Sequence, residues 1–154
     1  MRWFGCILFY IFSVSLAGCK YEPKNSTFCV NQLLSIKKIS FKPFLGYDEG
    51  YDYFLEHAND SGVRACLINN ITNETIIKDP FLLPGPRGDV VLGDVAYHIL
   101  YKNYGLDFRE NLPAHIREDY DRNGYLAYYY YVKNAADGRE IIKKNVIDYY
   151  RDHQ

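Results

Sequence analysis

The residues best suited to chemistry in this 154-residue chain are Asp94 and His98, which lie four positions apart. In a helix this spacing brings two side chains to one face. A carboxylate in that position can orient an imidazole as a general base or as a metal ligand. No nucleophile or second ligand pair has a recognisable spacing around them, so the sequence favours an ordinary pair on a helix surface.

The only spacing typical of a metal site is that of the EF-hand calcium loop. Positions 1, 3, 5 and 6 of that loop are matched by Asp119, Asp121, Asn123 and Gly124. Position 12, which should supply a bidentate glutamate, is Tyr130. The remaining donors fall short of the about six to eight oxygens that calcium binds. The sequence therefore predicts no cofactor, and it favours an Asn-Gly turn between helices over a calcium site.

Aromatic side chains offer a different kind of contact. The chain has 16 tyrosines, and four of them are consecutive. Neither a helix nor a strand can place four consecutive side chains on one face, so some rings must be exposed or covered by a partner. Tyrosine suits protein interfaces and sugar-stacking surfaces alike, and a tyrosine-filled core is the alternative. The candidate binding residues are Tyr128, Tyr129, Tyr130 and Tyr131.

Apolar periodicity predicts the helices that would position these residues. The clearest is residues 91–104, which has apolar residues on adjoining rows and Gly105 as a left-handed stop. A final helix over residues 141–151 would begin with Asp137 and Glu140 as a capping box and bury Ile142, Val146 and Tyr149. Shorter helices are predicted over residues 48–58, with Asp48 as a possible N-cap, and 113–120.

Strands are predicted only in the first half of the chain. Residues 63–68 and 74–78 flank a turn-rich segment and together indicate a β-hairpin. Residues 31–44 fit a helix and a strand equally well. The predicted fold class is therefore α+β, a single small domain with a short β-hairpin in its first half and a mainly helical second half.

The start of the chain carries a signal for export. Arg2 precedes an apolar stretch, residues 3–16, which is shorter than the about 20 residues of a membrane-spanning helix. Leu16-Ala17-Gly18-Cys19 closes this stretch. The tetrapeptide resembles the lipobox of bacterial lipoproteins. The alternative is an ordinary signal peptide that leaves Cys19 as a thiol.

The resemblance implies cleavage after Gly18, a diacylglycerol thioether on Cys19, and a further acyl chain such as palmitate on the new amino terminus. Lys20 then implies sorting to the outer membrane, facing the periplasm, in a Gram-negative host. We expect residues 1–18 to be removed, residues 19–27 to form a lipidated tether, and residues 28–154 to form one domain. The helix predicted over residues 91–104 opens with Leu92-Gly93-Asp94-Val95-Ala96. This segment is similar only to helix starts in small uncharacterised exported bacterial proteins, which implies no activity.

Composition agrees with export. Of the four cysteines, Cys6 leaves with the signal and Cys19 is acylated. Cys29 and Cys66 then remain as one pair in a compartment that permits disulfides, so we predict a bond between them; two buried thiols are the alternative. Without Arg2 the mature chain has 17 basic against 19 acidic residues. This balance gives no basic face for a nucleic-acid partner.

These observations favour a non-enzymatic protein-interaction module of the bacterial cell envelope, such as an immunity protein, an inhibitor or an accessory subunit. Its partners would be the membrane, through the lipid anchor, and an envelope or exported protein. A module that binds glycan or peptidoglycan through its tyrosines is the alternative. An envelope hydrolase that uses His98 with Asp94, or His115 with nearby acids, is the least favoured class.

Overall fold

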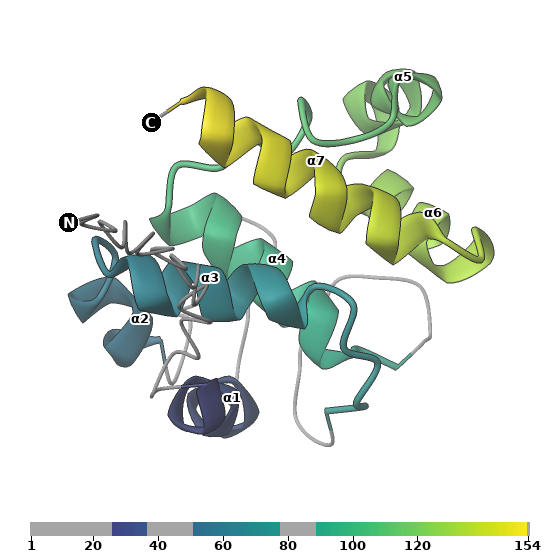
Figure 1. Ribbon diagram of the computed structural model, residues 1–154. Helices are drawn as coiled ribbons and strands as arrows, with labels where there is room; N and C mark the ends of the chain where they lie inside the picture. The colour runs from purple at the N-terminus through teal and green to yellow at the C-terminus, as the bar shows by residue number, and fades with distance from the viewer. Residues whose placement is uncertain (1–25, 37–50, 78–88, 154) are drawn as a thin grey trace, which may run out of the picture.

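The computed structural model describes residues 26–36, 51–77 and 89–153. These segments form helices arranged around a shared core (Figure 1). Among them lies no sheet, and the only β pairing is an isolated antiparallel bridge between Ile76 and Val91. The predicted α+β class was therefore wrong. The helices are α1 (Ser26–Ser35), α2 (Asp52–Glu56), α3 (Ser61–Asn70), α4 (Leu92–Asn103), α5 (Ala114–Asn123), α6 (Tyr125–Asn134) and α7 (Gly138–Asp152).

Helix α4 is the centre of the fold. Every residue from Leu92 to Leu100 is buried, because α3, α1 and α2 pack against it. Figure 1 shows α4 behind α3, with α7 crossing above both. The helix ends as its sequence predicted: Gly105 has a φ of 68°, and the N–H of Leu106 donates to the C=O of Leu100 at 3.3 Å. A helix buried on all sides belongs to the core rather than to a surface.

The predicted first strand, residues 63–68, lies inside α3. The carboxylate of Asp60 caps this helix by accepting the N–H groups of Gly62 and Val63 at 2.7 and 3.2 Å. Val63, Cys66, Leu67 and Asn70 are buried, and this spacing is that of one helical face. The β-branched residues of this segment suggested a strand, whereas the cap at Asp60 and packing against α4 decide for a helix.

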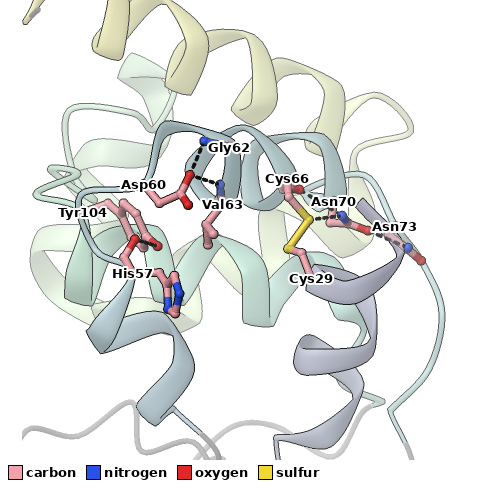
Figure 2. The surroundings of a disulfide bond; sticks show 9 residues. All are labelled: Cys29, His57, Asp60, Gly62, Val63, Cys66, Asn70, Asn73 and Tyr104. Carbon is pink, nitrogen blue, oxygen red and sulfur yellow. Dashed lines mark hydrogen bonds between the residues drawn. A yellow bond between two sulfur atoms is a disulfide. The ribbon is translucent and has the colours of Figure 1, made fainter. Parts of the chain in front are cut away.

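A disulfide joins α1 to α3, as the cysteine count predicted. Cys29 and Cys66 are both buried, and 37 positions separate them in the sequence. Figure 2 shows Asn70 beside this bond: its amide donates to the C=O of Cys66 at 2.9 Å and contacts Cys66 Sγ at 3.5 Å. Asn73 in turn donates to the side-chain oxygen of Asn70 at 3.0 Å. The end of α3 is thereby held against α1.

The second half of the chain is helical, as predicted, but its element boundaries differ. Helix α5 continues to Asn123, and only Gly124, at φ 59° and ψ −138°, separates it from α6. That backbone conformation is essentially restricted to glycine. Helix α7 begins at Gly138 without a side-chain cap from Asp137, so the predicted capping box was wrong. It buries Ile142 and Val146 as expected, together with Tyr150 rather than Tyr149.

Tyrosines fill much of the core, and their hydroxyls bond to backbone carbonyls. Tyr97 donates to Phe108 at 3.2 Å, Tyr104 to His57 at 2.9 Å, and Tyr150 to Tyr104 at 2.9 Å. Figure 2 shows the bond from Tyr104 to His57, which ties α4 to the end of α2. These bonds satisfy the polar tip of a ring whose body is buried.

Several predictions concern residues outside the described segments. The lipobox, Cys19 and the predicted N-cap Asp48 are among them. Helix α1 begins at Ser26, so the last two residues of the predicted tether belong to a helix. Helix α2 is shorter than the helix predicted over residues 48–58, and it buries Phe54 while Leu55 is exposed. None of the described helices is long and apolar enough to cross a membrane.

Candidate functional site

The predicted surface pair of Asp94 and His98 is buried, with 1% and 2% of each residue exposed. One oxygen of Asp94 accepts from Nη2 of Arg139 at 2.9 Å and from the hydroxyl of Tyr128 at 3.3 Å. Its other oxygen accepts the N–H of Val91 at 3.2 Å. The expectation of a surface pair was therefore wrong. Asp94 instead joins α4 to α6 and α7, and we call Asp94, Tyr128 and Arg139 the buried polar cluster.

Burial dominates the electrostatics of these groups. Desolvation raises the pKa of the Asp94 carboxyl, and the charge of Arg139 opposes that rise. Desolvation, helped by the charge of Lys102, lowers the pKa of His98 to about 3. The imidazole is consequently neutral at ordinary pH. A neutral histidine in the core has no direct access to a substrate, so neither residue is placed as an enzyme would need it.

Close backbone packing between the start of α4 and the end of α3 supports the buried polar cluster. A Cβ at Gly93 would lie 2.1 Å from the carbonyl oxygen of Ile71 and 2.9 Å from Nη1 of Arg139. The N–H of Gly93 also donates to the C=O of Asn73 at 2.9 Å. Only glycine lets the start of α4 approach the end of α3 and the Arg139 guanidinium this closely.

An open groove lies above the buried polar cluster. It has a volume of about 280 Å³ and runs between two walls. One wall consists of alternate residues from the two segments that meet at the β bridge. The other comes from α6 and the start of α7. The groove residues are Glu74, Ile76, Asp89, Val91, Tyr129, Val132, Lys133 and Arg139.

The alternation in the first wall follows from the pairing. The N–H of Leu92 donates to the C=O of Thr75, and the N–H of Ile77 donates to the C=O of Val90, both at 3.0 Å. Successive side chains of an extended segment point to opposite faces, so residues 74 and 76 share a face with residues 89 and 91. Tyr129, Val132 and Lys133 oppose them from a single face of α6.

The groove is lined by both apolar and charged side chains. Ile76 is 50% exposed there, next to the half-buried Val91. Glu74, Asp89 and Lys133 are exposed, and within the described segments none of them forms an ion pair. Nζ of Lys133 lies 5.4 Å from the centre of the Tyr129 ring and 3.4 Å from its hydroxyl. Arg139 differs from these charges because Asp94 neutralises it.

The calcium pattern does not form a loop. Asp119, Asp121 and Asn123 lie in the last turns of α5. Asp121 is held by Arg109 in a two-pronged ion pair of 2.7 and 2.8 Å, and the amide of Asn123 donates to Asp119. Across the described segments there is no group of three or more His, Cys, Asp or Glu side chains that could hold a metal. The arrangement favours the predicted turn at Gly124 over a cation site.

The tyrosine run is divided around α6. Tyr128 is fully buried and stacks on Tyr97 with ring centres 4.7 Å apart. Tyr129 lies in the groove and is 6% exposed, whereas Tyr130 is 48% exposed. Tyr131 is half-buried, with its ring 5.9 Å from that of the exposed His115. The four candidates therefore do not share a surface, and only Tyr129 belongs to the groove.

Sequence reasoning did not find the groove. Residues 74–78 were predicted to be extended, but their partner was placed in residues 63–68 instead of residues 89–91. The signal present in the sequence is the alternation of charged and apolar residues at Glu74 and Ile76 and again at Asp89 and Val91. Comparisons with protein-family models, with curated proteins and with solved structures find no match.

Proposed function

We propose that this chain is a non-enzymatic protein-interaction module of the bacterial envelope, anchored through acylated Cys19, and that it binds an envelope or exported protein through the groove. The observation that carries the proposal is the contrast between the groove and the residues suited to catalysis. Asp94 and His98 are buried, whereas Ile76 and three charges that form no ion pair among the described residues face solvent around one concave surface.

The composition of the groove suits a protein partner. Protein interfaces have an apolar centre, a polar rim, and an enrichment in tyrosine and arginine. The groove has the same kinds of residue: Ile76, Val91 and Val132 are apolar, and Glu74 and Lys133 are charged. Charges at a rim steer association and select partners more than they add affinity. The groove therefore has the features of a recognition surface.

The two alternative functions have less structural support. A glycan site would need adjacent exposed rings on which sugars stack, but Tyr130 is the only member of the tyrosine run that is classed as exposed. Co-sedimentation with purified cell-wall sacculi that is lost in Tyr130→Ala would favour the glycan function. A hydrolase based on His98 would need the core to open. The exposed His115, the other candidate, makes no hydrogen bond or ion pair with a carboxylate among the described residues.

The lipobox supports the anchor. Seven residues span the distance from Cys19 to the start of α1 at Ser26. A fully extended chain of this length reaches about 25 Å, so an anchored body would stay close to the membrane surface. Intact-mass spectrometry of the full-length product tests this part of the proposal. We expect a chain that begins at Cys19 and carries acyl groups; an unmodified mass would contradict the anchor.

The interaction itself is tested with the full-length chain, tagged at its carboxyl end and extracted in mild detergent from the cells that produce it. We expect one protein partner at a stoichiometric ratio. Ile76→Asp should lose that partner because it replaces an exposed apolar side chain of the groove by a charge. Ile147→Asp is the matched control, since Ile147 is similarly exposed, at 46%, and does not line the groove. Recovery of the bait alone, or a partner retained by Ile76→Asp, would argue against the proposal.

A further inference from the structure

The segment next to the groove has an open backbone edge. Thr75 and Ile77 direct their backbone groups toward residues 90–92, through the two bonds described above. Adjacent residues of an extended segment direct theirs to opposite edges, so Glu74 and Ile76 point away from that pairing. Within the described residues, the N–H and C=O groups of Glu74 and Ile76 make no hydrogen bond. An unpaired edge of this kind is a template for another extended chain.

The open edge and the groove belong to the same two residues. The side chains of Glu74 and Ile76 line the groove, while their backbone groups form the edge beside it. A strand added to this edge would continue the pleat, so alternate side chains of the added strand would project on the groove side. Backbone bonds would supply affinity and the groove would select the side chains, which is how strand addition recognises peptides.

Charge indicates which side chains fit. Arg139 is neutralised by Asp94. In the part of the chain that the structure describes, the groove charges without an ion pair are then Glu74 and Asp89 against Lys133. The excess is negative, so a basic side chain complements it. Ile76, Val91 and Val132 offer an apolar surface beside these carboxylates. An extended segment with an apolar residue and a basic residue on the same face satisfies both features.

We propose that the partner docks by adding an extended, basic and apolar segment as a strand to the edge formed by Glu74 and Ile76. This inference rests on the proposed function and specifies its partner chemistry. The segment donates to and accepts from the backbone of Ile76, inserts an apolar side chain against Ile76 and Val132, and places its basic side chain near Glu74.

The probe for this proposal is a displayed library of random 12-residue peptides, selected against the full-length chain in detergent. Selected peptides are then titrated against Ile76→Pro, which removes an N–H that makes no hydrogen bond with the described residues. We expect Ile76→Pro to weaken binding at least about 10-fold, because it deletes a backbone donor of the edge. Ile76→Val keeps that donor and should change the affinity less than about 3-fold. Glu74→Lys should weaken the basic peptides and leave the melting temperature of the protein unchanged.

A second experiment changes the peptide and leaves the protein unaltered. Each residue of the selected peptide is N-methylated in turn, and binding is measured. Methylation should abolish binding at every second position, because only alternate N–H groups of an added strand face the edge. Failure to select any peptide, affinity unchanged by Ile76→Pro, or loss without a period of two would overturn the inference. If a partner captured from cells is lost in Ile76→Asp while the scan shows no such period, strand addition is wrong and the proposed function stands.

Discussion

The buried polar cluster and the groove share Arg139, yet their charged side chains differ in exposure to solvent. In the cluster, Asp94 is neutralised by Arg139 and hydrogen-bonded by Tyr128 and Val91, and it is 1% exposed. In the groove, Glu74, Asp89 and Lys133 are exposed and carry no ion pair among the described residues. A buried ion pair joined by hydrogen bonds holds a structure in one arrangement, whereas exposed charges remain available to a partner. On this difference we base the proposal that the cluster positions the walls and that the groove binds the partner.

The link between the two regions is physical. Asp94 fixes the backbone of Val91, which is one half of the bridge, and the guanidinium of Arg139, which lies in the opposite wall. Both walls of the groove are thus held by a single carboxylate. Changes in the cluster should therefore alter stability first, and changes at the exposed charges of the groove should alter binding first.

Removal of the Arg139 charge should produce the largest loss of stability. Arg139→Met keeps much of the side-chain length and leaves Asp94 buried without its counter-charge. Breaking a buried ion pair in this way costs about 3–5 kcal/mol. The loss, measured by urea unfolding at pH 7, should shrink at pH 4, because the carboxyl can then be protonated. A variant as stable as the wild type would show that the pair does not hold the walls.

An added methyl group at Gly93 should come next. Gly93→Ala would place a Cβ 2.1 Å from the Ile71 carbonyl, so helix α4 must shift. We expect a loss of about 3 kcal/mol, at the upper end of the cost of overpacking. Gly62→Ala is the control, since its Cβ would meet only the Asp60 carboxylate, at 3.1 Å. Equal losses from both substitutions would contradict a special role for the contact between α3 and α4.

The buried histidine should make the protein sensitive to acid. The pKa of His98 falls from 6.5 to about 3 on folding. Below pH 6.5 the imidazole is therefore protonated in the unfolded chain but not in the folded chain. The stabilising contribution is present above pH 6.5 and is lost as the pH falls toward 3. Between pH 7.5 and 4.5 it amounts to about 2–3 kcal/mol. The free energy of unfolding of the wild type and of His98→Gln is measured at both pH values. The difference between the two proteins should change by about 2–3 kcal/mol between these pH values.

Substitution of an exposed charge of the groove should have the smallest effect on stability. Lys133→Gln removes an exposed charge whose described contacts are with Tyr129. A cation above an aromatic ring at an exposed site contributes about 0.5–1 kcal/mol, so the unfolding free energy should fall by no more than that. Thermal unfolding of the variant, beside Arg139→Met, tests the contrast between the two regions. A loss as large as that of Arg139→Met would place Lys133 in the structural framework.

Local signals in the sequence predicted helices, but they did not predict which segments distant in the sequence pair with one another. The stop at Gly105, the turn at Gly124 and the apolar rows of residues 91–104 all act within a few residues, and the structure confirms them. The strand predicted for residues 63–68 was wrong because packing against α4 outweighs the strand preference of their side chains. The disulfide was predicted by counting, because the predicted loss of Cys6 and the predicted acylation of Cys19 leave a single pair.

The candidate site was harder to predict for the same reason. Asp94 and His98 share a helical face, but nothing near them in the sequence indicates that Arg139, 45 positions later, neutralises Asp94. The groove depends on the meeting of residues 76 and 91 and on helix α6 opposite them. Each part is visible as a local pattern, but their assembly is a tertiary event. The sequence therefore supported the proposal of an interaction protein without indicating the groove through which we propose that it binds.

Site-specific photocrosslinking in the producing cells tests the central claim most directly. A photoreactive phenylalanine derivative replaces Lys133 in the groove and, in a second strain, the exposed Ile147 outside it. We expect one adduct of defined mass from position 133 that the variant Ile76→Asp eliminates, and no such adduct from position 147. Adducts of equal yield from both positions, or an adduct from position 147 alone, would contradict the assignment of recognition to the groove.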